Sequence, residues 1–184
     1  MKENNLLEKY YEYFKNEDWL NAQKILEVLI SSSKEESFWL YTSLSSVFYE
    51  LKNYDEALKY SKLAYSLNPE SPLVLWDYAG VLYMLNKEQE AIDLWQIIIK
   101  TNEDVLAFEL TTAGLRWART LKNDALYRIA QSYYYLENDK LALEYAMNHL
   151  NNRKKGQKSL YKKSEILSLI EKMKGDTKSA GTHC

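Results

Sequence analysis

One pattern of apolar and small residues occurs twice between residues 38 and 103, at a spacing of 34 positions. The first copy contains Tyr54-Asp55-Glu56-Ala57 and the second contains Glu88-Gln89-Glu90-Ala91, so Ala57 and Ala91 mark the same place. A helical stripe precedes each copy, with Tyr41, Leu44 and Phe48 in one and Leu75, Tyr78 and Leu82 in the other. Such self-similarity indicates a repeat architecture, in which each unit is a small helical element that packs on its neighbours.

The stretch from Tyr54 through Leu67-Asn68-Pro69 resembles the second helix and closing proline of the tetratricopeptide repeat, a helix–turn–helix unit. The resemblance implies an all-α, right-handed helical-repeat solenoid of antiparallel helix pairs. We expect about four repeats, one irregular insertion and a C-terminal capping helix. The expected repeats lie near 3–36, 38–71, 72–105 and 123–156, the insertion at 105–121 and the capping helix at 164–174. Together they form a predicted domain over 1–175, and the tail 176–184 is predicted to be disordered.

The composition also favours helices. The 184 residues include only 5 Gly and 2 Pro, which leaves little room for the frequent turns of an all-β fold. Hydrophobic residues make up 46% of the chain, enough to form a packed core. Pro69 is expected to stop one helix, and Pro72 is expected to lie in the first turn of the next.

The regular spacing changes after the third repeat. Ala142 is the next residue that matches Ala91, and it follows 51 positions later, which is one period plus 17 residues. The additional residues are 105–121, whose apolar positions predict one or two helices with a break at 111–114. Two interpretations of this insertion stay open: a contact with a particular partner, or a variation in packing.

Charge is unevenly distributed along the chain. Residues 1–102 carry 10 Lys/Arg against 16 Asp/Glu, whereas residues 103–184 carry 14 against 10. This polarity indicates either two solvated surfaces that differ or a polarised partner site. The net charge of −2 disfavours a general nucleic-acid binder. The basic loop 153–163 has few aromatic residues beside it for base stacking, so we interpret it as a solvated linker.

Several features bear on the compartment and on catalysis. Cys184 is the only cysteine, which rules out an intrachain disulfide. The chain has no signal-peptide-like start and no apolar run near the ~18 residues of a membrane helix, so we expect a cytoplasmic protein without a membrane segment. The only histidines are His149 and His183, and His149 replaces an Ala of the repeat, which favours packing. We therefore expect no enzymatic activity, no cofactor and no metal site. The oligomeric state stays open.

The resemblance also implies a binding surface, because the first helix of each pair lines a concave groove in this family. Carried onto this sequence, the predicted partner-binding residues are Tyr11, Phe14, Trp39, Tyr49, Trp76, Tyr83, Tyr127, Gln131, Tyr134 and Tyr135. The periodicity agrees with this, since Leu73, Trp76, Gly80 and Tyr83 form one helical stripe beside a second apolar stripe. A helix that is apolar on two faces must bury both. The alternative interpretation is ordinary core between repeats.

The predicted function is a non-enzymatic protein–protein interaction module that binds a peptide or partner protein in an aromatic-lined groove. The alternative is a dedicated inhibitor or immunity-type protein that binds and blocks one cognate enzyme, using the insertion and the basic C-terminal half. An RNA-binding solenoid is a third, weaker possibility. Some family members clamp the carboxylate tail of chaperones with Lys, Asn and Arg. Here Ser43 and Asp77 stand where that Asn and Arg are expected, so we do not expect a chaperone-tail binder.

Overall fold

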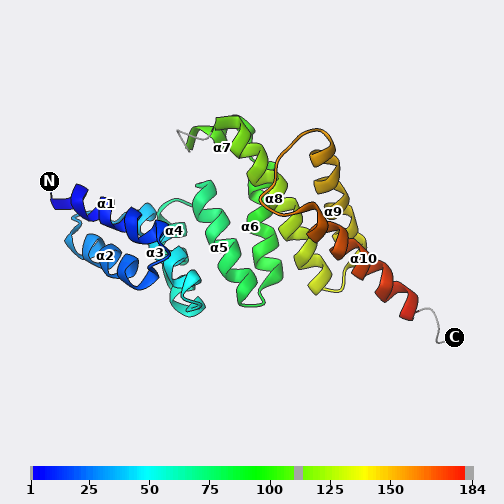
Figure 1. Cartoon of the computed structure of the whole chain (residues 1–184), viewed down its shortest axis with the longest axis horizontal. Helices are drawn as coiled ribbons and strands as arrows, with labels where there is room; N and C mark the ends of the chain where they lie inside the picture. Colours follow the sequence, from blue (N-terminus) through cyan, green and yellow to red (C-terminus); the bar gives the residue numbers. More distant parts are fainter. Residues whose placement is uncertain (1, 110–113, 181–184) are drawn as a thin grey trace. The chain divides into compact units, whose positions relative to one another are not determined.

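The computed structural model describes residues 2–109 and 114–180, and these ranges contain ten α-helices and no strand (Figure 1). The all-α helical-repeat class predicted from the sequence is confirmed. The chain divides into two compact units, Met1–Asn86 and Lys87–Cys184, here called the N-terminal and C-terminal units. The single domain expected over 1–175 stays a prediction. Across the described ranges, every helix is too short or too polar to cross a membrane.

The N-terminal unit is built from successive helices that pack against one another. They are α1 (Lys2–Lys15), α2 (Trp19–Ser32), α3 (Phe38–Glu50), α4 (Tyr54–Leu67) and α5 (Pro72–Met84). α1 pairs with α2 and α3 pairs with α4, while α5 contacts both α3 and α4. Pro72 occupies the first turn of α5 as expected, because the amide hydrogen that proline lacks has no helical partner there.

Small residues let α3 and α4 approach closely. Ser45 and Ala57 are fully buried between these helices, and Ala64 is almost as buried further along α4. The Ser45 hydroxyl lies 2.9 Å from the Ala57 carbonyl oxygen, to which it donates, and 2.7 Å from the Ser61 hydroxyl. The hydroxyl thus satisfies its hydrogen-bonding needs inside the core, and a larger side chain would separate the helices.

The turn inside each repeat has the same backbone geometry. One non-glycine residue in each turn adopts the left-handed conformation: Glu17 (φ 56), Lys52 (φ 60), Asn86 (φ 55) and Glu137 (φ 56). Glycine is the usual residue at such a place, but none of these four positions is a glycine. The sequence therefore carries no glycine signal for these turns. The recurrence shows that the four turns share one backbone conformation.

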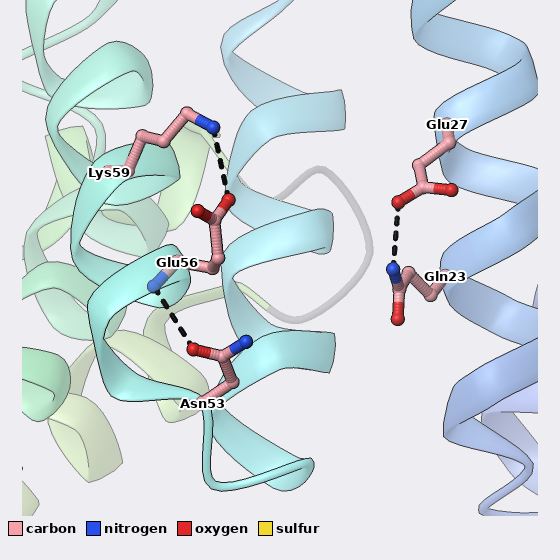
Figure 2. Close-up of polar contacts among 5 residues, drawn as sticks. All are labelled: Gln23, Glu27, Asn53, Glu56 and Lys59. Carbon is pink, nitrogen blue, oxygen red and sulfur yellow. Dashed lines mark hydrogen bonds and ion pairs between the residues drawn. The ribbon is translucent and has the colours of Figure 1, made fainter.

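The second helix of three repeats begins with a side-chain cap. Asp18, Asn53 and Asn138 accept hydrogen bonds from backbone N–H groups three residues later, at 3.2–3.4 Å. Figure 2 shows the Asn53 cap on Glu56, whose carboxylate also lies 3.0 Å from the Lys59 ammonium. The same view shows Gln23 donating to Glu27 across one turn of α2, at 2.7 Å. These contacts stabilise the helix starts, where backbone N–H groups lack helical partners.

The C-terminal unit is organised around one long helix. Its elements are α6 (Glu88–Lys100), α7 (Glu103–Glu109), α8 (Gly114–Tyr135), α9 (Asp139–Lys154) and α10 (Lys163–Ala180). α8 contacts each of the other four helices. The predicted third repeat is therefore divided, with its first helix, α5, in the N-terminal unit and its second, α6, in the C-terminal unit.

The insertion 105–121 forms no separate domain. Its first part lies in α7, and its last part forms the beginning of α8, which continues without interruption into the first helix of the fourth repeat. The continuity follows from the sequence 114–135, which contains no proline. The expected break at 111–114 falls mostly outside the described residues, with Gly114 (φ 59) at the start of α8.

The capping helix α10 begins one residue before the predicted start and extends beyond the predicted end at Lys174. Residues 176–180, which the sequence assigns to a disordered tail, are helical, because Gly175 costs only about 1 kcal/mol relative to Ala and no proline follows. Residues 181–184 lie outside the described part. The expected apolar side packs on α8 and α9 through Ile166, Leu169, Ile170 and Met173, whereas Leu167 is exposed.

Candidate functional site

The predicted partner-binding residues lie on the first helices of the repeats, as the family pattern implies. Tyr11 and Phe14 lie on α1, Trp39 and Tyr49 on α3, and Trp76 and Tyr83 on α5. The remaining four, Tyr127, Gln131, Tyr134 and Tyr135, lie on α8. Six residues thus belong to the N-terminal unit and four to the C-terminal unit.

In the N-terminal unit, three of the predicted residues meet at one surface. The rings of Tyr11 and Trp39 have centroids 6.3 Å apart, and the buried Tyr10 contacts Trp39 at 5.9 Å and Phe14 at 5.7 Å. Tyr11 is 57% exposed and Phe14 39%. Tyr11, Phe14 and Trp39 therefore form an accessible α1–α3 aromatic cluster that rests on Tyr10.

The other three predicted residues of this unit do not join the aromatic cluster. Tyr49 lies near the opposite end of α3, where its ring contacts Tyr54 of α4 at a centroid distance of 5.6 Å. Trp76 and Tyr83 are both partly buried on α5. These three side chains combine some packing with some accessible surface, so the groove and core interpretations both apply to them.

A polar contact between α3 and α5 adds a residue that the aromatic pattern does not single out. The Ser46 hydroxyl donates to Asp77 at 2.6 Å, linking the first helices of two successive repeats. Burial raises the pKa of the Asp77 carboxyl to about 6, and the hydrogen bond from Ser46 partly opposes that rise. Only the mismatch with the chaperone-tail clamp draws attention to Asp77 in the sequence.

In the C-terminal unit, a groove of about 440 Å³ lies between α8 and α10. All four predicted residues of α8 line this α8–α10 groove. The opposite wall comes from α10, through Ser164, Glu165, Ser168, Leu169 and Lys172. The predicted surface on the fourth repeat therefore coincides with a cavity, and the capping helix supplies its second wall.

The α8 residues differ in how much surface they offer. Tyr135 is 60% exposed and its ring lies 5.7 Å from that of Tyr134. Tyr127 is only 5% exposed, since it packs in the core cluster and its ring contacts Tyr161 at 4.5 Å. Gln131 donates from Nε2 to the Tyr127 hydroxyl at 3.1 Å. The accessible wall therefore consists mainly of Gln131, Tyr134 and Tyr135, while Tyr127 lines the groove from a largely buried position.

The connection between α9 and α10 is fixed to α8 by buried polar groups. Asn123 Nδ2 donates to the Lys158 carbonyl oxygen at 3.2 Å. The Asp124 carboxylate accepts from the Ser159 hydroxyl and the Leu160 backbone N–H. Burial raises the pKa of the Asp124 carboxyl, and these hydrogen bonds partly oppose the rise. The loop that leads into α10 is thereby held in one position relative to α8.

His149 also contacts Asn123, the α8 residue that binds the α9–α10 connection. It is fully buried, and its Nδ1 lies 2.7 Å from the Asn123 carbonyl oxygen, so this side chain packs in the core instead of facing a substrate. Burial lowers the pKa of the imidazole. In the described parts of the chain, no three His, Cys, Asp or Glu side chains gather closely enough to hold a metal ion.

Comparison with known families supports the repeat pattern. Two stretches match the family described as Tetratricopeptide repeat, residues 43–70 and residues 124–155. They coincide with the predicted second and fourth repeats. No curated protein matches the sequence significantly.

Solved structures share the fold at low sequence identity. YrrB, "a TPR protein with an unusual peptide-binding site", is 20% identical with a TM-score of 0.62, over 78% of this chain and 66% of that one. A tetratricopeptide repeat protein from Parabacteroides merdae ATCC 43184 is 20% identical with a TM-score of 0.68, over 95% and 60%. The apo form of RapI is 14% identical with a TM-score of 0.76, over 97% and 65%. The chain spans less than two thirds of the length of each. The chain therefore carries two stretches that match the tetratricopeptide repeat, and it shares the helical-repeat fold of these solved structures.

Proposed function

We propose that this chain is a non-enzymatic interaction module that holds a peptide or a partner protein against the first helices of its repeats. The main support for this function is the α8–α10 groove, whose accessible α8 wall is formed by Gln131, Tyr134 and Tyr135. Its volume of about 440 Å³ falls in the range of ligand-binding clefts, about 300–1,000 Å³.

The chemistry of the groove suits a segment of polypeptide. Tyrosine brings a large contact area, little loss of side-chain freedom and one polar tip. The α10 wall adds hydroxyls from Ser164 and Ser168 and opposite charges from Glu165 and Lys172. A partner segment that inserts an apolar side chain between the two walls would therefore find polar groups at the rim for its backbone.

The α1–α3 aromatic cluster supplies a further contact surface in the N-terminal unit. Tyr11, Phe14 and Trp39 expose neighbouring ring surface there, and aromatic residues are enriched where interfaces gain most of their binding energy. YrrB, which shares the fold, is described as having a peptide-binding site, and this likeness supports the same class of function here.

The experiment compares what co-purifies with the full chain and with paired variants. Tyr134→Ala with Tyr135→Ala removes the aromatic wall of the groove. Leu143→Ala with Met147→Ala is the matched control, because these exposed apolar residues (38% and 41%) lie on α9 outside the groove. We expect partners held by the wild type and the control to be lost from the tyrosine variant, with unchanged helical content by circular dichroism. Equal recovery with all three proteins would remove the groove as the binding site.

A dedicated inhibitor of one enzyme is the second candidate, and one feature of the insertion favours it. Phe108 on α7 is 82% exposed, and Val105 and Leu115 nearby in sequence are also exposed. Exposed apolar side chains on an inserted element are typical of a partner contact. An inhibitor would form a complex with a single enzyme that Phe108→Ala weakens and that the tyrosine variant leaves intact.

A further inference from the structure

Two sequence features that the groove does not involve, the insertion and the basic loop, come together in the C-terminal unit. A pocket of about 290 Å³ lies between the first turns of α8 and the connection from α9 to α10. It is lined by Arg116, Arg119, Lys155, Gly156, Gln157 and Lys158. Among these described lining residues four are cationic and none is acidic. We refer to this site as the basic pocket.

We propose that the basic pocket binds an acidic segment of a partner protein, a short run of Asp or Glu side chains. Arg119 already binds a carboxylate of this kind within the chain. Its Nε donates to the Glu103 carboxylate of α7 at 2.8 Å. Arg116, Lys155 and Lys158 are exposed, and within the part of the chain that the structure describes they form no ion pair. They are therefore the cations that an incoming carboxylate can reach.

The fold holds the backbone of this loop in place before any partner arrives. The Lys158 carbonyl oxygen is bound by Asn123 of α8, and the next two residues are bound by Asp124. Gly156 adopts φ 88, where a side chain would be strained, and its N–H donates to the Arg153 carbonyl oxygen at 3.0 Å. A site whose backbone is already ordered loses less entropy on binding.

Bringing like charges together is unfavourable unless an anion neutralises them. The hydrogen bonds of the loop, and not any attraction between the cations, place Lys155 and Lys158 opposite Arg116. A carboxylate-bearing segment relieves that repulsion, and a guanidinium can bind a carboxylate with two parallel hydrogen bonds. Charge complementarity therefore selects an acidic occupant.

The surroundings favour polypeptide over nucleic acid. None of the described residues that line the pocket is aromatic, whereas single-stranded nucleic acids are held by rings that stack on the bases. The chain as a whole carries a net charge of −2, which disfavours a long polyanion. Enclosed apolar walls, which small-molecule sites need, are also missing from this lining.

The test measures binding of a fluorescein-labelled hexaglutamate peptide to the full chain by fluorescence anisotropy at low salt. The pocket variant combines Arg116→Gln, Lys155→Gln and Lys158→Gln. The control combines Lys9→Gln, Lys62→Gln and Lys140→Gln, which removes the same charge from exposed positions outside the pocket. Because each surface ion pair contributes modestly, we expect affinity to fall on the order of tenfold in the pocket variant and less than about twofold in the control.

Three results would overturn the proposal. The first is that the wild type fails to bind the peptide, and the second is that both variants lose affinity equally. The third is that a single-stranded RNA hexamer binds more tightly than the peptide and depends on the same three residues. Helical content by circular dichroism checks that both variants fold. If the triple variant unfolds, the single variant Lys158→Glu replaces it, with Lys140→Glu as the control, since both lysines are exposed. Lys158→Glu must then weaken peptide binding, and Lys140→Glu must not.

Discussion

The Asp77 carboxyl lies where ionisation is unfavourable, so we expect Asp77→Asn to stabilise the protein at neutral pH. The side chain is partly buried and accepts a hydrogen bond from Ser46 at 2.6 Å. Desolvation raises the pKa of this carboxyl to about 6, against an ordinary value of 3.8 for aspartate. An asparagine of similar shape keeps a hydrogen-bonding partner for Ser46 without the buried charge.

The magnitude follows from the shift in pKa. One pKa unit corresponds to about 1.36 kcal/mol, so ionised Asp77 costs at most about 3 kcal/mol at pH 7 relative to a freely solvated carboxylate. Partial exposure of Asp77 screens the charge, and we expect a gain of about 1–2 kcal/mol from the substitution. Because the folded pKa is the higher one, the stability from protonated Asp77 is complete below pH 3.8 and is lost as the pH rises through about 6.

The assay is urea unfolding of the wild type, Asp77→Asn and Ser46→Ala, followed by circular dichroism near pH 7.5 and near pH 3. Asp77→Asn should be more stable at the higher pH and match the wild type at the lower pH. Ser46→Ala should be less stable at the higher pH, because it removes the hydrogen bond that favours the carboxylate. A gain for Asp77→Asn that persists near pH 3, or no gain near pH 7.5, would show that ionised Asp77 does not destabilise the folded protein.

Three further predictions concern the packing of the repeats. Ala57→Leu should destabilise the protein by about 1–3 kcal/mol in urea unfolding, because Ala57 is fully buried where α3 and α4 cross. Lys52→Gly should stabilise it by about 0.5–1 kcal/mol and raise the Tm, since Lys52 adopts φ 60 in an exposed turn. Stability that depends on neutral His149 should be present above its unfolded pKa of about 6.5 and be lost as the pH falls through its lower folded value. Thermal unfolding of the wild type and His149→Gln from pH 7.5 to 5 should therefore show a steeper acid dependence for the wild type.

Unchanged stability in Ala57→Leu would mean that the α3–α4 crossing has room for a larger side chain. A loss of stability in Lys52→Gly would show that the Lys52 side chain contributes more than its backbone strain costs. Parallel pH curves for the wild type and His149→Gln would show that the buried imidazole is not the group that titrates.

The sequence predicts the repeat units well, for a reason that concerns local contacts. Ala57 and Ala91 recur with the spacing of one helix pair, and both are fully buried. Apolar stripes at helical spacing report which face of each helix is covered, and a repeated stripe reports that the same neighbour recurs. The helix pairs α1–α2 and α3–α4 and the apolar side of α10 therefore follow from patterns within a few tens of residues.

What the sequence leaves open depends on contacts between distant positions. Ser46 meets Asp77 across 31 residues, and Asn123 meets Lys158 across 35. Neither pair belongs to a periodic pattern, so no local signal indicates that they meet. The same holds for the burial of Tyr127, a residue of the groove lining that Tyr161 and α10 largely cover.

Local sequence patterns are sufficient to predict the helical class, the length of the repeat and the faces that carry aromatic side chains. The packing of distant segments is what makes α10 the second wall of a groove and brings the insertion and the basic loop to one pocket. The physical reason is that periodicity records how a helix contacts its own neighbours, whereas a site between distant segments depends on the angle and register at which whole helices pack.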